Sequence, residues 1–142
     1  MSTSDLEQVL RAAGLRVTAP RKAVLAQARA HPHADADTIA RAVRERHGAV
    51  STQAIYDVLH ALTGAGLLRR IEPAGSPARY ESRVHDNHHH LICRSCSEII
   101  DIDCATDAVP CLEASDSWGY SIDEAEVTYW GLCPTCRPSA SP

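Results

Sequence analysis

Residues 51–71, STQAIYDVLHALTGAGLLRRI, contain the change in hydrophobic spacing that decides the fold. The apolar residues first recur at intervals of three and four, which predicts a helix with one buried face. That face consists of Ile55, Val58, Leu59 and Leu62. Ser51 is suited to cap the start of this helix, and Gly64 and Gly66 end it. From Leu67 to Ile71 the pattern is that of a strand.

The segments on either side complete a small domain. Residues 72–77 contain two prolines and a glycine and predict a turn into a second strand at 78–81. Three helices are expected upstream, over residues 5–13, from Thr18 to about residue 30, and from a cap at Asp35 to Gly48. Four helices followed by a β-hairpin are typical of a winged helix-turn-helix domain, and we assign residues 1–82 to it.

The solvent-facing side of the helix after Ser51 carries polar side chains. That side shows Thr52, Gln53, Tyr56 and Asp57, which can reach base edges and phosphates and favour DNA binding over a helical domain with no such role. Ser51 is assigned to the same DNA-binding set. Charge supports this choice, because residues 1–82 hold 11 Lys or Arg and 8 Asp or Glu. Residues 83–142 hold 3 Lys or Arg and 10 Asp or Glu. This acidic half is suited to binding cations or to forming dimer contacts, and chance composition is the alternative explanation of the charge difference.

Two pairs of cysteines stand in the acidic half, at Cys93 and Cys96 and at Cys133 and Cys136. Two C-x-x-C pairs can surround one ion with four thiolates, a closed structural zinc site. A thioredoxin-like redox motif is the alternative, but it belongs to a βαβ unit that this sequence lacks. Cys104 and Cys111 fit neither pair; we interpret them as buried or unused thiols, with a redox role as the alternative.

A histidine run precedes the first cysteine pair. On a strand, His88 and His90 share one face and His89 takes the other. Two imidazoles together with carboxylates such as Glu81 and Asp101 form a donor set that suits Fe(II), Mn(II) or Zn(II). The alternative is a patch of solvated histidines that binds no metal.

Strands are expected at 91–92, 99–102 and 127–132, with a short helix over 110–117. The overall prediction is an α+β protein whose small α/β domain, residues 83–137, precedes a disordered tail at 138–142.

Several motifs in fixed order resemble the ferric uptake regulator (Fur) superfamily across nearly the whole chain. They are RVTAPR at 16–21, HADAD at 33–37, the helix at 51–62, RYE at 79–81, HHHLICRSC at 88–96 and WGLCPTC at 130–136. The resemblance implies a homodimer that binds double-stranded operators of dyad symmetry when a regulatory metal is present. It implies a structural zinc on Cys93, Cys96, Cys133 and Cys136, and a regulatory metal on His33, Glu81, His88, His90 and Asp101.

The resemblance also implies that the helix after Ser51 enters the major groove. Tyr56 is then nearest the bases, and Arg16 and Arg21 lie near phosphates. A metal that joins His33 to the later ligands would fix the angle between the two halves. The further metal site of many family members is expected to be absent or degenerate, because Asn87, Ala108 and Ala125 stand where ligands belong.

Within the superfamily the chain resembles the actinobacterial FurA type, which is related to the PerR peroxide sensors. This implies Fe(II) or Mn(II) as regulatory metal, with Zn(II) able to substitute in vitro, and peroxide-driven oxidation of His33 or His88 that relieves repression of catalase-peroxidase genes. Asp101 favours this subtype and Glu81 weakens it, so an iron-uptake or zinc-uptake repressor is the alternative.

A metalloenzyme or thiol oxidoreductase is the hypothesis from another class. The regulatory site could keep an open coordination position, but the sequence offers no substrate site, so we expect no enzymatic activity. No apolar run is long enough to cross a membrane, and the first residues are polar and acidic without a signal pattern. A cytoplasmic protein without membrane partners is expected.

Overall fold

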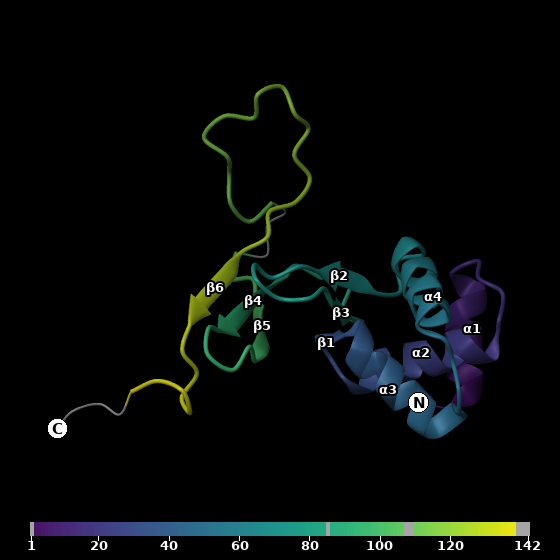
Figure 1. Cartoon of the computed structure of the whole chain (residues 1–142). Coiled ribbons are helices and arrows are strands. Elements are labelled where there is room, and N and C mark those ends of the chain that lie inside the picture. Colours follow the sequence, from purple (N-terminus) through teal and green to yellow (C-terminus); the bar gives the residue numbers. More distant parts are fainter. Residues whose placement is uncertain (1, 85, 107–109, 139–142) are drawn as a thin grey trace. The chain divides into compact units, whose positions relative to one another are not determined.

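The chain divides into two compact units, Met1–Val84 and His85–Pro142 (Figure 1). The computed structural model describes residues 2–84, 86–106 and 110–138. Ala108, which stands where a ligand of the family's further metal site is expected, and the end of the predicted tail, residues 139–142, lie outside the described residues.

Four helices build most of the first unit: α1 (Thr3–Ala12), α2 (Ala19–Ala30), α3 (Ala36–His47) and α4 (Thr52–Gly64). The predicted caps Asp35 and Ser51 are confirmed, and Thr18 caps α2 in the same way. Each side-chain oxygen accepts a hydrogen bond from the amide three residues later, at distances of 2.8–3.2 Å. These pairs are Thr18 with Arg21, Asp35 with Thr38, and Ser51 with Ala54. Gly48 ends α3 with a φ of 81°, a value that glycine adopts without strain.

A small antiparallel sheet completes this unit, in the order β1-β3-β2. The predicted hairpin is present as β2 (Arg69–Ile71) and β3 (Arg79–Glu81). The short strand β1 (Ala34–Asp35) was not expected from the sequence, since its two residues pair with Tyr80 and Arg79 far along the chain. β1 brings the end of α2 beside the second hairpin strand.

One hydrophobic core fills the first unit. It consists of apolar side chains from all four helices together with Ala34, Leu68 and Tyr80. The inward residues predicted for the fourth helix, Ile55, Val58, Leu59 and Leu62, all belong to it. No helix in the described part of the chain is long and apolar enough to cross a membrane.

The second unit contains a three-stranded sheet in the order β5-β4-β6. Its strands are β4 (His88–Cys93), β5 (Ile99–Asp103) and β6 (Thr128–Gly131); β4 pairs antiparallel with β5 and parallel with β6. In this register His90 lies opposite Asp101, and Leu91 lies opposite Ile100 and Tyr129. Side chains directly opposite each other share a face. The face with Leu91, Ile100 and Tyr129 is largely apolar, whereas the face with His88, His90 and Asp101 also carries apolar residues such as Ile92 and Ile99.

The segment between β5 and β6 contains no helix among its described residues, and Figure 1 shows it as a wide loop. The short helix expected over residues 110–117 is therefore wrong. Pro110 precedes a stretch rich in Ser and Asp, and Leu112 is 60% exposed. Without a buried apolar face, a helix of two turns gains too little to form.

Candidate metal centres and nucleic-acid-binding surface

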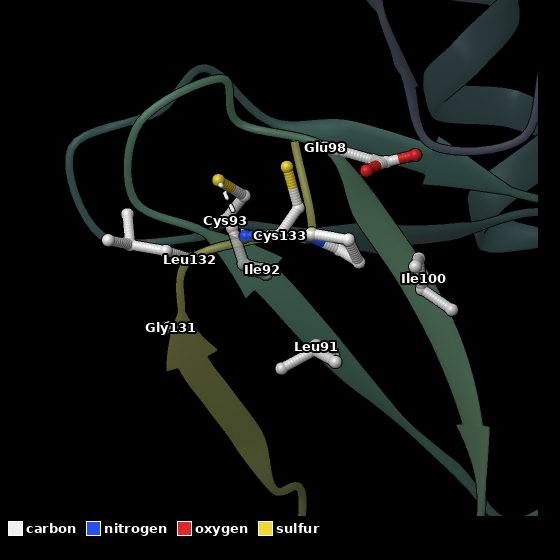
Figure 2. A pocket seen from close by; sticks show the side chains of 9 residues that line it. Leu91, Ile92, Cys93, Glu98, Ile100, Gly131, Leu132 and Cys133 are labelled. Atoms are coloured by element: carbon white, nitrogen blue, oxygen red, sulfur yellow. Dashed lines mark hydrogen bonds between the residues drawn. The ribbon is translucent and has the colours of Figure 1, made fainter. Parts of the chain in front are cut away.

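Four cysteine sulfurs converge at one end of the second unit. Cys93 ends β4, and Cys133 follows β6 closely, so the parallel pairing of these strands brings the two C-x-x-C turns together. The ligand atoms of Cys93, Cys96, Cys133 and Cys136 all lie within 4.8 Å of one another. The Cys133 amide donates to the Cys93 sulfur at 3.4 Å (Figure 2). This spacing fits four thiolates around one tetrahedral ion.

The thiols of this cluster have unequal pKa values. Hydrogen bonds from backbone amides, first that of Cys96, lower the pKa of Cys93 to about 6. Hydrogen bonding with the Cys133 side chain raises the pKa of Cys136 to about 12. Without a cation, negative charge is therefore concentrated on Cys93. A cation bound by all four sulfurs must displace the protons that remain, so its affinity falls with acidity.

In the first unit, His33 and Glu81 form a buried pair. Their Nε2 and Oε2 atoms are 3.3 Å apart, and Glu81 is only 1% exposed. The backbone of His33 has a φ of 64°, and its amide donates to the Tyr80 carbonyl at 3.0 Å. The pairing of β1 with β3 thus places a histidine from the end of α2 next to a carboxylate of the hairpin.

In the second unit, two imidazoles face one carboxylate. Asp101 Oδ1 lies 3.4 Å from His90 Nε2 and 3.7 Å from His88 Nε2. The two rings are in edge contact, with centroids 5.0 Å apart, and both histidines are buried. The strand geometry accounts for this arrangement, because His88 and His90 point to the same face of β4 and Asp101 pairs with His90.

Asp86 is a candidate positioning residue that the sequence argument did not identify. Its Oδ1 atom is 2.9 Å from His88 Nδ1, which fixes the proton on Nδ1 and leaves the Nε2 lone pair directed to Asp101. A carboxylate that orients a histidine in this way is a regular partner of metal-binding imidazoles. Its position two residues before His88 was the available signal.

The outer side of α4 presents the side chains expected to contact DNA. Ser51, Thr52, Gln53 and Tyr56 are all exposed, and Tyr56 is 47% exposed. Gln53 donates to Asp57 at 2.9 Å, which orders the amide on this surface. The Ser51 hydroxyl caps the helix, so its remaining hydrogen-bonding capacity is what a phosphate could use.

Hydrogen bonds from Arg21 and Arg44 fix two stretches of backbone in the first unit. Arg21 donates to the Arg16 carbonyl at 2.9 Å, so the two cationic residues are linked at the start of α2. Arg44 was not identified from the sequence. It donates to the Val50 carbonyl at 2.9 Å and to the Thr52 hydroxyl at 3.1 Å, and thereby ties the end of α3 to the start of α4.

Sequence comparisons show one family. The profile of the ferric uptake regulator family matches residues 12–130. Transcriptional regulator FurA of Mycobacterium tuberculosis is 63% identical over 97% of this chain and 94% of its own length. Ferric uptake regulation protein 1 of Mycolicibacterium fortuitum is 57% identical over 94% and 83%. The peroxide-responsive repressor PerR of Staphylococcus aureus is 28% identical over 90% and 86%.

Solved structures of similar fold come from the same family. The Helicobacter pylori ferric uptake regulator, described with three functional metal-binding sites, covers 99% of this chain and 97% of its own, with a TM-score of 0.71 at 18% identity. The Pseudomonas aeruginosa ferric uptake regulator with manganese has a TM-score of 0.69 at 25% identity, covering 91% and 98%.

Proposed function

The chain belongs to the ferric uptake regulator family and is a metal-dependent transcription regulator, and we propose that it represses its target genes as a homodimer. The family expected from the ordered motifs is thereby confirmed. The observation that carries the proposal is a second set of possible metal ligands. Besides the four-cysteine cluster, the two units contain paired imidazole and carboxylate groups, His33 with Glu81 and His90 with Asp101. The two relatives above that exceed 50% identity are named as regulators, which supports a regulatory rather than a catalytic role.

The first unit is the DNA-binding domain in this proposal. It acts as a winged helix, with α4 in the major groove and the β2–β3 hairpin as the wing. Thr52, Gln53 and Tyr56 contact bases, and Ser51, Arg16 and Arg21 contact phosphates. The exposed side chains on the outer side of α4 and the hydrogen bonds from Arg44 to the start of α4 support this assignment.

Zinc on Cys93, Cys96, Cys133 and Cys136 is the structural ion in this proposal. Four thiolates leave no open position, and soft sulfur donors select zinc over harder cations. The same unit buries few apolar side chains in its described part, namely Ile92, Cys93 and Cys104, so a cross-linking ion supplies stability that the core does not.

The regulatory metal, Fe(II) or Mn(II), takes ligands from both units. We assign it to His33 and Glu81 of the first unit and to His88, His90 and Asp101 of the second. Mixed imidazole and carboxylate donors suit these cations, and the sets also accept Zn(II) in vitro. Because the ligands belong to two units, binding favours the arrangement that brings both sets onto one ion. Metal occupancy thereby sets the spacing of the two α4 helices in the dimer.

The dimer interface in this proposal is the apolar face of the β5-β4-β6 sheet. Leu91, Ile100 and Tyr129 lie side by side across the three strands and are 37–50% exposed. Leu132 extends the same apolar surface and also lines a pocket with Leu91 and Ile100 (Figure 2). A second copy that covers this row removes apolar area from water.

A DNA-selection experiment tests the proposed repressor. Duplexes selected from a random pool by the Mn(II)-loaded protein should share a sequence of dyad symmetry, and fluorescence anisotropy should show binding that requires the metal. The His90→Ala variant should lose this metal dependence and keep its circular dichroism. His47→Ala, an exposed histidine of α3, is the matched control. Metal-dependent binding by His90→Ala would contradict the proposed regulatory site.

The signal sensed is hydrogen peroxide in our proposal, with iron uptake as the alternative. The aspartate at position 101 resembles the residue found in peroxide sensors and supports peroxide sensing. In contrast, two relatives that are more than 50% identical to this chain are named ferric uptake regulation proteins. Fe(II) supplies the peroxide reactivity when bound. Peptide mass spectrometry after peroxide treatment of the Fe(II) protein should show an added oxygen on His33 or His88. Loss of DNA binding on iron removal alone, without such an adduct, would favour the iron sensor.

A further inference from the structure

A third group of metal-ligating side chains lies on the other face of β4. His89 points away from His88 and His90, and it pairs in register with Ile102 of β5. Cys104 follows two residues after Ile102 and is buried, as is His89. Cys111, from the loop before β6, places its sulfur 3.1 Å from His89 Nε2. One ligand atom from each of the three residues lies within 4.8 Å of the others.

The three side chains come from separate segments, which argues against an accidental contact. His89 belongs to β4, Cys104 follows β5, and Cys111 belongs to the long loop. Burial and the adjacent Cys104 thiol raise the pKa of Cys111, so its proton is retained while no cation is present. The group therefore combines two thiols and an imidazole on an otherwise apolar face.

We propose that His89, Cys104 and Cys111 form a second thiolate site, which binds Zn(II) with an open fourth position. Two thiolates and one imidazole are a donor set that zinc accepts with a water or other exchangeable ligand in the remaining place. The bound ion ties the long loop to the β5-β4-β6 sheet. Cys104 is buried, as expected. The proposal gives Cys104 and Cys111 a ligand role instead of leaving them as unused thiols.

Zinc binding at His89 breaks hydrogen bonds that the ion-free side chain makes. The Val127 amide donates to His89 Nδ1 at 3.2 Å, so in the ion-free ring Nε2 carries the proton and donates to Cys111. Zinc at Nε2 displaces this proton and transfers the N–H to Nδ1, which ends the hydrogen bond from Val127. The site is therefore weaker and more exchangeable than the four-cysteine site.

Cobalt spectroscopy separates this site from the other two. The reduced full-length protein is first loaded with one zinc per chain at Cys93, Cys96, Cys133 and Cys136, and Co(II) is then added. Co(II) on imidazole and carboxylate ligands gives no sulfur charge-transfer absorption, whereas Co(II) on Cys104 and Cys111 gives a strong near-ultraviolet band. The wild-type chain should show this band with its zinc content unchanged, and added Zn(II) should remove it.

The variants make the test decisive. The double variant Cys104→Ser/Cys111→Ser should lose the band, and His89→Ala should weaken cobalt binding while His47→Ala leaves it unchanged. In the wild-type chain, Zn(II) should also slow alkylation of Cys104 and Cys111, a readout that needs no variant. A wild-type protein without the band, or a band that persists in the double variant, would overturn the proposal. Equal alkylation rates with and without Zn(II) would do the same.

Discussion

At the scale of single residues, the contact between Asp86 and His88 yields a prediction. Asp86→Ala removes the acceptor that holds the proton on His88 Nδ1, so the ring is free to turn or to change tautomer. Mn(II) affinity, measured by titration calorimetry, should fall by about 10- to 100-fold. Asp123→Ala, an exposed carboxylate of the same unit, is the control and should leave the affinity unchanged. Equal affinity in the Asp86 variant would show that other groups orient His88.

Residue type and spacing predicted some of the site and left other parts undetermined. The two C-x-x-C pairs indicate their shared ion directly, because each pair is local and the four sulfurs meet as expected. His33 is different, since only the family resemblance identified it. Its pairing with Glu81 depends on β1, on a φ of 64° and on a hydrogen bond to Tyr80, none of which is encoded in its neighbours.

At the scale of elements, the cap of α3 has a measurable and pH-dependent effect. Asp35→Ala removes the hydrogen bond to the Thr38 amide and should lower the free energy of unfolding by about 1 kcal/mol. The hydrogen bond to Thr38 lowers the pKa of Asp35 below its ordinary 3.8. Its stabilisation is therefore fully present above that value and is lost as the pH falls through the lowered pKa.

Urea unfolding followed by circular dichroism measures this effect at neutral and acidic pH. The difference between wild type and Asp35→Ala should be largest near neutrality and shrink below pH 3.8. Asp37→Ala is the matched control, because Asp37 lies in the same first turn. It should cost less, since it loses only the favourable interaction of its charge with the helix dipole. Equal losses in both variants would argue against the cap.

Helices were more predictable than strands for a physical reason. A helix forms its hydrogen bonds within one segment, so apolar spacing and caps such as Asp35 and Ser51 were sufficient. Strand β1 depends on a partner more than 40 residues away, and its two residues carry no pattern of their own. The expected helix at 110–117 failed for the opposite reason, because local propensity there had no core to pack against.

At the scale of the whole molecule, the two units differ in what stabilises them. The hydrophobic core consists of residues from Leu6 to Tyr80 and lies wholly in the first unit. The described part of the second unit has only a short sheet, whose apolar face is largely exposed. The first unit should therefore fold without metal, whereas the second should depend on zinc and on its partner.

Cys133→Ser tests this difference. The variant should lose the structural zinc and the dimer, because three thiolates no longer enclose the ion and the sheet that carries Leu91 and Tyr129 loses its cross-link. Elemental analysis and sedimentation equilibrium measure these two losses. The helical signal of circular dichroism should largely remain, since α1 to α4 pack on their own core. Cys104→Ser lies outside the four-cysteine cluster and provides the comparison; it should retain the structural zinc and the dimer. A zinc-free dimer of Cys133→Ser would show that the sheet is stable without its ion.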